Sequence, residues 1–421
     1  MTNNKSPEPS TCDTTAGQLL SPTEARRRIL AAVIPLSAEE RVPVRAALGR
    51  ALSRDITSAM DVPPYDNSAM DGYALRGADL PASGERLFRN VGRALAGAPY
   101  TGQVGAGQCV RIMTGAILPP GTDTVVMQEH AATMGGEIRI GSGHRAGENV
   151  RRAGEDIKFG ETVLSAGTAV LPAELGLLAS LGIAEVPVTR RVRVAFFTTG
   201  DELCGLGETL AAGQIYDSNR YTLFGMLNRL GVTPLDMGVI RDRRADVRRA
   251  LQEAAAVADV VITSGGVSVG EADYVTETLE ELGEIDFWRI AMKPGKPLAV
   301  GRLEGAYFFG LPGNPVSAMA TFYQFVQPGL RRLMGQAPEP DTILCVPCAT
   351  DLHKQPGRLE YQRGILVGDD DGNLRVHSTG SQGSHVLTSM SRANCFIILP
   401  AESSGATAGE LVRVQPFAGL M

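Results

Sequence analysis

The spacing of hydrophobic and polar residues predicts two helices outside the central part of the chain. The segment SPTE at residues 21–24 combines a capping box with proline at the first helical position. Ile29, Leu30, Val33 and Ile34 then follow at helical spacing. A second, shorter helix is predicted over Ala173 to Leu181, and we expect its segment to pack back on the first helix.

From Arg191 onward, short apolar runs alternate with longer segments of helical periodicity. The predicted strands are Val192 to Phe197, Val232 to Val239, Asp259 to Thr263, Leu298 to Gly301 and Ala306 to Leu311. The predicted helices are Asn219 to Leu230, Ala245 to Ala258, Tyr274 to Leu282 and Pro315 to Leu333. Such alternation is typical of a mostly parallel sheet with helices on both faces, wound in both directions by right-handed crossovers.

The rest of the chain is rich in glycine and in short β-like runs, so we predict an α/β protein of several domains. Residues 1–15 are expected to form a disordered tail. Residues 16–60 and 150–190 are expected to form one domain from two segments, with a β-rich domain of residues 61–149 inserted between them. Residues 191–336 form the predicted doubly wound α/β domain. A proline-rich linker then leads to a small β-barrel or sandwich over residues 341–421.

Composition narrows the class of protein. The 421 residues include 43% hydrophobic and 20% charged side chains, 49 glycines and 25 prolines. Aromatic residues make up only 5% and the net charge is -6, which argues against broad nucleic-acid binding. No apolar run is long enough to span a membrane, and residues 1–20 do not resemble a secretory signal. The six cysteines are scattered, as is typical of reduced thiols, so we expect a cytoplasmic protein.

Small, polar and acidic residues follow three predicted strands, where parallel sheets bind ligands. The segments are TTGDE at residues 198–202, SGGVSVG at residues 264–270 followed by Asp273, and PGNP at residues 312–315. The second segment can bring backbone N–H groups close to an anion at the start of a helix, although it can also be an ordinary strand-to-helix turn.

Two lysines and several acids add candidate chemistry. Two prolines and a glycine stiffen the turn KPGKP at residues 293–297, so its lysines are presented rigidly, as capture of an oxyanion requires. The alternative is an ordinary surface loop whose lysines are solvated. Asp201, Glu202, Asp242 and Asp273 lie near predicted strand ends and together suggest Mg²⁺, although each alone is a plausible helix cap or exposed acid.

Other motifs allow ordinary structural explanations. Asp71, in the turn-rich segment PPYDNSAMDGYA at residues 63–74, could cap a helix. Arg358, Arg363 and Arg375 could be strand-edge charges. Cys345 and Cys348 have the spacing of a metal or redox pair, but no second pair follows, so buried or incidental thiols are favoured.

Taken together, these motifs resemble the MoeA family of molybdopterin molybdenumtransferases, which is similar to the E domain of gephyrin and Cnx. The motifs are PPYDNSAMDGYA, TGDEL (199–203), YDSN (216–219), TSGGVSVGEADY (263–274), MKPGKP (292–297) and LPGNP (311–315). The resemblance implies an elongated four-domain homodimer with a MogA-like α/β domain. It also implies insertion of molybdate into adenylylated molybdopterin with Mg²⁺-dependent release of AMP, in a cleft between the α/β domain of one subunit and the C-terminal domain of its partner.

The resemblance also implies a set of functional positions. They are Asp71, Thr114, Asp156, Glu202, Asp242, Asp273, Lys293, Lys296, Pro312, Pro315, Arg363 and Ser384. Lys293 and Lys296 are expected to bind oxyanion and phosphate, and Glu202, Asp242 and Asp273 to supply the Mg²⁺ ligands. The residues expected to bind phosphate in the glycine loop are Ser264, Gly265, Gly266, Ser268 and Gly270. Arg363 and Ser384 would close the anion site, and Asp71 would orient groups across the cleft.

Two other functions remain open on the sequence. The α/β domain also resembles the MogA-type fold that adenylylates molybdopterin, which suggests an adenylyltransferase as an alternative or as a transient partner. A non-catalytic scaffold of the gephyrin type is the other alternative. Tungstate in place of molybdate is also open, since the two oxyanions have nearly the same size and charge.

Overall fold

The computed structural model describes residues 19–266 and 274–417, and the chain divides into two compact units. The first unit comprises Met1–Glu40, Gly49–Ala51 and Val188–Met421, and the second comprises Arg41–Leu48 and Leu52–Pro187. The predicted disordered tail lies outside the described residues. The finer division into four domains stays a prediction.

A six-stranded sheet with the order β16-β13-β17-β21-β20-β18 forms the centre of the first unit. Its strands are β13 (Arg193–Thr199), β16 (Thr233–Ile240), β17 (Val260–Ser264), β18 (Gly283–Arg289), β20 (Pro297–Leu303) and β21 (Ala306–Leu311). Strands β16, β13, β17 and β21 run parallel to one another. Strand β20 is antiparallel to both of its neighbours, β21 and β18. The predicted α/β architecture is confirmed. Strand β18 was not predicted, because it is an edge strand of mixed burial without an apolar run.

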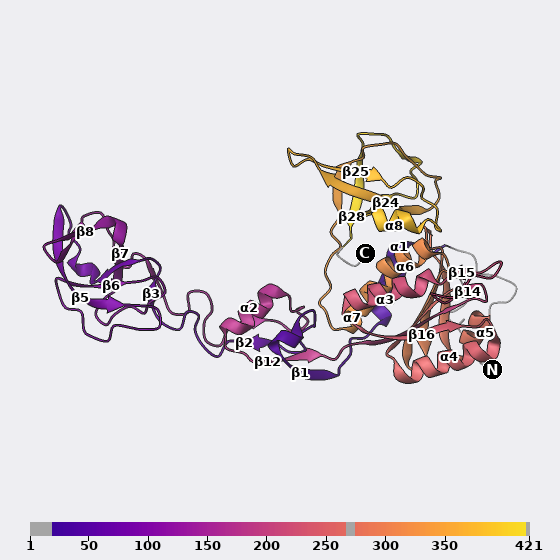
Figure 1. Cartoon of the computed structure of the whole chain (residues 1–421), viewed down its shortest axis with the longest axis horizontal. Helices are drawn as coiled ribbons and strands as arrows, with labels where there is room; N and C mark the ends of the chain where they lie inside the picture. Colours follow the sequence, from indigo (N-terminus) through magenta and orange to yellow (C-terminus); the bar gives the residue numbers. More distant parts are fainter. Residues whose placement is uncertain (1–18, 267–273, 418–421) are drawn as a thin grey trace, which may run out of the picture. The chain divides into compact units, whose positions relative to one another are not determined.

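Alternating residues of the buried strands pack against helices on the two faces of this sheet. Val194 and Phe196 contribute to the core shared with α1 (Pro22–Ala32), α3 (Ser218–Leu230), α6 (Pro315–Thr321) and α7 (Gln327–Leu333). Ala195 and Phe197 contribute to the core beneath α4 (Arg244–Val257) and α5 (Tyr274–Leu282). The two helical layers are visible on opposite sides of the sheet in Figure 1.

The predicted helix over Pro315 to Leu333 contains a π-helical turn between α6 and α7, at Phe322–Val326. Pro328 explains the interruption, because proline lacks an N–H and its ring clashes with the carbonyl four residues earlier. Helix α1 begins as predicted, with the Ser21 hydroxyl accepting a hydrogen bond from Glu24 N at 3.2 Å. It packs in the first unit, where Ile29 and Leu330 belong to the same core, whereas α2 (Pro172–Ser180) belongs to the second unit, so the expected packing of the second helix segment on α1 stays a prediction.

The C-terminal residues of the first unit form a small barrel. Its strands are β22 (Leu344–Pro347), β24 (Leu359–Gly368), β25 (Leu374–Ser378), β26 (Cys395–Leu399) and β28 (Leu411–Pro416), and β23 (Leu352–His353), β27 (Gly405–Ala406) and α8 (Leu387–Arg392) flank them. A parallel bridge between Cys348 and Val376 joins the end of β22 to β25 and closes the ring. The short strand β19 (Met292–Lys293), from the α/β part, pairs in parallel with β24.

The second unit is β-rich. Its six-stranded sheet has the order β7-β4-β6-β5-β9-β8. These strands are β4 (Gly72–Leu75), β5 (Glu85–Ala94), β6 (Gln108–Ile112), β7 (Thr124–Met127), β8 (Ala131–Met134) and β9 (Glu137–Gly141). The smaller elements are β2 (Ile56–Thr57), β3 (Asn67–Ser68), β10 (Val150–Arg151), β11 (Thr162–Leu164), α2 (Pro172–Ser180) and three 3₁₀ turns (Val44–Ala47, Gly77–Asp79 and Gln128–His130). Strands β1 (Glu39–Pro43) and β12 (Glu185–Thr189) pair where the chain passes between the units.

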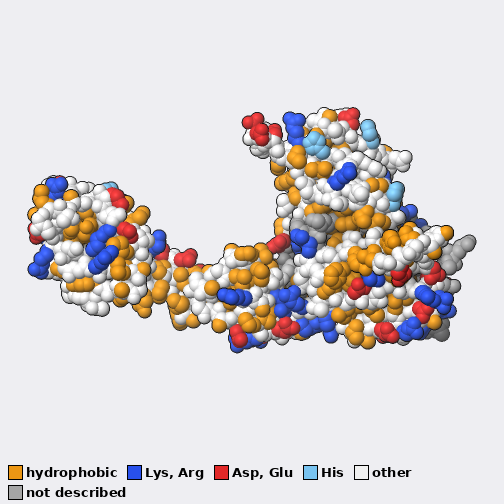
Figure 2. All heavy atoms as spheres, viewed as in Figure 1, with side chains coloured by type: hydrophobic (Ala, Val, Ile, Leu, Met, Phe, Trp, Pro, Cys, Tyr) orange, Lys and Arg blue, Asp and Glu red, His pale blue; other side chains and the backbone are white. Residues whose placement is uncertain are grey.

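The surface gives two further observations. Basic and acidic side chains are interspersed over the visible face of the first unit in Figure 2, rather than sorted into faces of one sign. Among the helices of the described ranges, none has both the length and the apolar character needed to cross a membrane.

Candidate active site

A cavity of about 970 Å³ opens at the carboxyl ends of the parallel strands in the first unit. The residues after β13, β17 and β21 lead directly into it: Thr199 and Gly200, Gly265 and Gly266, and Pro312 to Asn314. Strand β13 pairs with β16 on one side and with β17 on the other, so the sheet changes winding direction here. Open α/β sheets bind ligands at such a switch point. The structure thus has a cavity where the sequence predicted the site.

One side chain ties these loops together. Asn219, at the start of α3, donates from Nδ2 to Ser264 Oγ at 2.9 Å and to Gly313 O at 2.7 Å. Ser264 Oγ in turn donates to Pro312 O at 3.1 Å. Ser264 is only 2% exposed and does not line the cavity. Its hydroxyl therefore fixes the loops, and its expected role in substrate binding stays a prediction.

The glycine turn after β17 needs residues without a side chain. Gly265 has a φ of +95°, and a Cβ there would lie 2.7 Å from Thr199 O. A Cβ on Gly266 would lie 2.5 Å from Val275 Cγ2. The N–H of Gly265 donates to Leu311 O at 3.2 Å, so this group is already used within the protein. Ser268, Gly270 and Asp273 lie outside the described residues, and their predicted roles are untested.

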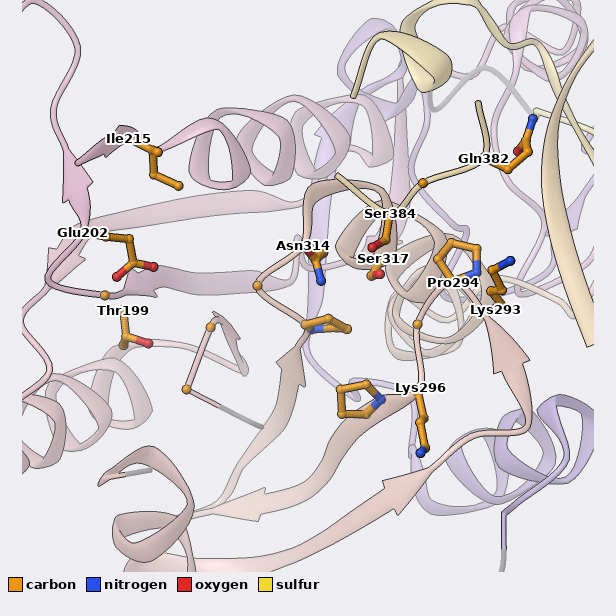
Figure 3. A pocket seen from close by; sticks show the side chains of 18 of the residues that line it. Thr199, Glu202, Ile215, Lys293, Pro294, Lys296, Asn314, Ser317, Gln382 and Ser384 are labelled. Carbon is orange, nitrogen blue, oxygen red and sulfur yellow. The ribbon is translucent and has the colours of Figure 1, made fainter. Parts of the chain in front are cut away.

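The two predicted lysines line the same cavity as the glycine turn. Gly295 between them has a φ of +101° and packs against Thr321, whose Oγ1 would lie 2.5 Å from an added Cβ. Figure 3 shows Lys293, Pro294 and Lys296 on one side of the pocket and Thr199 and Glu202 on the other. Asn314, Ser317 and Ser384 lie between the two sides. The pocket therefore has a basic end and an acidic end.

The carboxylates at the acidic end of the pocket lie close enough to repel one another. Glu202 and Asp242 line the cavity, and Asp201 Oδ1 lies 3.4 Å from Asp242 N. Burial and then the neighbouring carboxylates of Asp201 and Glu202 raise the pKa of Asp242. Within residues 19–266 and 274–417, no group of three or more His, Cys, Asp or Glu side chains is placed to hold a metal ion alone. Mg²⁺ often uses only one or two carboxylates, with phosphate oxygens and water, and this arrangement fits Glu202 and Asp242.

The C-terminal barrel supplies the remaining wall. Arg358, Gln382, Gly383 and Ser384 line the cavity, and Ser384 O accepts a hydrogen bond from Val316 N of α6 at 3.1 Å. Residues of the α/β part and of the C-terminal barrel of one chain therefore line this cavity, and the expected contribution of a partner's C-terminal domain stays a prediction. Ser384 lies where it was predicted. Arg358 was interpreted only as a possible strand-edge charge, yet its side chain borders the pocket.

Arg363 has a different position from the one expected. It is fully buried and does not line the cavity. Its Nε donates to Ser389 Oγ and its Nη2 to Gly383 O, both at 3.0 Å, while Gln382 Oε1 accepts from its backbone N at 2.7 Å. Burial lowers the pKa of this guanidinium to about 10. In this structure Arg363 supports the loop that lines the pocket, and its expected direct contact with an anion stays a prediction.

The remaining predicted positions divide between the two units. Pro312 lines the cavity, whereas Pro315 begins α6 and does not. Asp71, Thr114 and Asp156 belong to the second unit. The Asp71 carboxylate accepts hydrogen bonds from Thr114 N at 2.7 Å and Thr114 Oγ1 at 2.8 Å, and these bonds lower the pKa of Asp71. Asp156 is exposed. The roles of these three residues in substrate binding stay predictions.

Comparison with known proteins gives the same pattern over the whole chain. Three family profiles match in order: the MoeA N-terminal region (domains I and II) over residues 20–182, a probable molybdopterin-binding domain over residues 195–332, and the MoeA C-terminal region (domain IV) over residues 346–417. A molybdopterin molybdenumtransferase of Haemophilus influenzae is 43% identical over 406 residues, which is 96% of this chain and all of that protein. The chain belongs to the MoeA family.

Further relatives agree with this MoeA assignment. The molybdopterin molybdenumtransferase of Bacillus subtilis is 35% identical over 89% of each chain. Two crystal structures of a molybdopterin biosynthesis MoeA protein from Pyrococcus horikoshii superpose with TM-scores of 0.82 and 0.77, at 28% and 32% identity. They cover 95% and 96% of this chain and the whole of the other chains. The MoeA fold therefore extends over both units.

Proposed function

We propose that this chain is a molybdopterin molybdenumtransferase that inserts molybdate into adenylylated molybdopterin and releases AMP. The observation that supports this most directly is the polarised pocket, in which Lys293 and Lys296 lie across small polar side chains from Glu202. Arg358 and Asp242 also line this pocket. Two relatives, at 43% and 35% identity, are molybdopterin molybdenumtransferases, and this chain matches them over 100% and 89% of their length.

The reaction has an electrostatic difficulty that this pocket can address. Molybdate and a phosphate group are both dianions. At about 4 Å and an effective dielectric near 20, two unit charges interact by roughly 4 kcal/mol, so two dianions repel by roughly four times as much. Lys293 and Lys296 can offset that repulsion at one end of the pocket, where preorganised cations stabilise oxyanions, and Arg358 adds a third cation to the lining. We assign molybdate to this end.

We assign the adenylyl phosphate to the other end, beside Glu202 and Asp242. These two carboxylates would hold Mg²⁺ together with phosphate oxygens. Burial and the neighbouring carboxylates of Asp201 and Glu202 raise the pKa of Asp242, and a bound cation would offset that repulsion. When bound, Mg²⁺ would polarise the phosphoanhydride for cleavage. Ser317, Asn314 and Ser384 can orient the ligand by hydrogen bonds between the two ends. Asp273 remains a predicted third Mg²⁺ ligand.

The direct test uses purified protein, adenylylated molybdopterin, molybdate and Mg²⁺. We expect AMP release that depends on molybdate and stops on addition of EDTA. AMP release at the same rate without molybdate would contradict the proposal. Formation of adenylylated molybdopterin from ATP and molybdopterin would instead favour the adenylyltransferase alternative. Replacing molybdate by tungstate in the same assay measures the preference between the two oxyanions.

We also infer a homodimer, and a transient contact with a MogA-type adenylyltransferase as the source of the adenylylated substrate. Several large apolar side chains of the second unit are exposed, as expected of a surface that meets another subunit. They are Tyr65, Met70, Phe159 and Leu171. Light scattering on the purified protein tests the dimer, and a monomer at micromolar concentration would contradict it. The cytoplasmic location stays a prediction.

A further inference from the structure

Glu360 is a buried carboxylate beside the pocket that the proposed reaction does not yet use. Its side chain is 4% exposed, and it does not line the cavity. Its Oε1 lies 3.2 Å from Lys293 Nζ and accepts a hydrogen bond from Gln362 Nε2, also at 3.2 Å. Lys293 is the one cation that forms an ion pair with Glu360 in the described part of the chain.

The backbone fixes this ion pair. Strands β19 and β24 pair in parallel with Lys293 opposite Glu360, and Leu359 N donates to Ala291 O at 3.0 Å. Because a buried carboxylate is costly to leave without a partner, the ammonium of Lys293 is retained beside it. The C-terminal barrel thus determines where a lysine of the α/β part lies.

The ion pair leaves the lysine able to bind a ligand. An ammonium has three N–H donors, and the Lys293 side chain is 48% exposed where it lines the cavity. Lys296, in contrast, forms no ion pair with any of the described residues, and it lines the same cavity. A lysine that is ordered before the anion arrives loses less rotamer freedom on binding.

We propose that Glu360 is a positioning residue for the oxyanion site, acting through Lys293; this inference rests on the proposed function. Two effects of Glu360 oppose each other. Its negative charge reduces the attraction of the pocket for an anion, whereas its hydrogen bond holds the Lys293 ammonium at the pocket wall. The second effect dominates, because the pair is set by strand register and one side of the lysine stays open.

Two substitutions of equal length separate these effects. Glu360→Gln keeps an oxygen that can accept from Lys293 Nζ but removes the charge, and Glu360→Met removes both. We expect Glu360→Gln to leave the KM for molybdate unchanged or to lower it, because the hydrogen bond stays and the opposing charge is removed. We expect Glu360→Met to raise it on the order of tenfold, the upper range for ordering one long side chain. The KM for adenylylated molybdopterin should change by less than about twofold in both, because Glu360 acts on one lysine of the basic end.

A double-mutant cycle and a control complete the design. In a Lys293→Met background, Glu360→Met should have no further effect on the KM for molybdate, because the residue through which Glu360 acts is absent. Glu410→Gln is the matched control: Glu410 lies in the same barrel, accepts a hydrogen bond from Thr407 N at 2.8 Å, and does not line the pocket. It should leave both KM values unchanged.

The possible outcomes are distinct. A lower KM for molybdate in both Glu360 variants would show that Glu360 acts only as a counter-charge, and the inference would be wrong. An unchanged KM with a lower melting temperature would leave Glu360 a purely structural residue, and would also overturn it. If Glu360→Met does not fold, Glu360→Leu takes its place. Titration calorimetry of molybdate alone gives an independent readout: a weaker affinity in Glu360→Met supports positioning even if wild-type protein shows no turnover, in which case only the proposed function fails.

Discussion

Gly295 tests whether the rigid turn, and not the mere presence of two lysines, forms the basic end of the pocket. Gly295→Ala changes neither lysine. The backbone φ of +101° disfavours any residue with a Cβ, by about 1–2 kcal/mol. The new methyl group would lie 2.5 Å from Thr321 Oγ1 and 2.9 Å from Met292 Cε, and such overpacking costs about 1–3 kcal/mol more.

Gly305 provides the matched control. It lies in the hairpin between β20 and β21 with a φ of +97°, and an added Cβ would meet nothing within 4 Å. Gly305→Ala should therefore lose only the backbone contribution, about 1–2 kcal/mol, with an unchanged KM for molybdate. Gly295→Ala should lose about 2–5 kcal/mol in total. Part of that strain should displace the turn, and a displacement near 1 Å can cost up to about a hundredfold in activity.

The assay compares both variants by melting temperature and by the KM for molybdate. We expect the KM to rise at least about tenfold in Gly295→Ala and to stay at the wild-type value in Gly305→Ala, with kcat for the pterin substrate measured at saturating molybdate. Equal losses of stability in the two variants, with an unchanged KM in Gly295→Ala, would refute the argument that the turn geometry determines anion binding.

Three further predictions follow from the same geometry. Arg358→Ala should raise the KM for molybdate about tenfold with little change in melting temperature, because the side chain is half-buried and borders the pocket; equal KM values would exclude it from the anion site. Mg²⁺ at ten times its Kd should stabilise wild-type protein by roughly 1.4 kcal/mol but not Asp242→Asn, as measured by thermal denaturation; an equal shift in both would place the ion elsewhere. The pKa of Asp259 is lowered: burial alone would raise it, but hydrogen bonds and charges from Arg190 and Arg193 outweigh that effect. Its contribution to stability is therefore present above the ordinary Asp pKa and is lost as the pH falls below it, so Asp259→Asn should unfold with a weaker acid dependence than wild type.

The sequence predicted the α/β sheet well because its central strands are buried on both faces. Val194 to Phe197 and Val260 to Ile262 form continuous apolar runs, and such runs have few alternatives in a globular protein. These runs also predicted where the strands end, and therefore which loops line the pocket. Strand β18 could not be found in this way, because an edge strand exposes part of its residues and its sequence resembles a polar loop.

The C-terminal wall shows a different limit. Arg358 lies in the bend just before strand β24, whereas Arg363 lies within the strand. Arg363 packs into the interior, and Arg358 borders the pocket. The sequence does not show this difference, because Glu360 to Gly364 are all buried although three of them are polar or charged. Only the pairing of β24 with β26 and β19 decides which arginine meets the ligand.

No local sequence pattern predicts the role of Glu360. Its ion pair with Lys293 shows how the barrel contributes to the site at the edge of the α/β sheet. Glu360 and Lys293 are distant in sequence, and neither flanking segment signals a pair. Their contact depends on two residues of β19 pairing in parallel with β24. An α/β domain alone would end its basic turn in solvent, where a lysine samples many rotamers. With the barrel present, Lys293 is paired with a buried carboxylate, whereas Lys296 has no ion pair with any of the described residues. The two lysines of the turn should therefore contribute unequally: Lys293 to the position of the oxyanion, and Lys296 mainly to its charge.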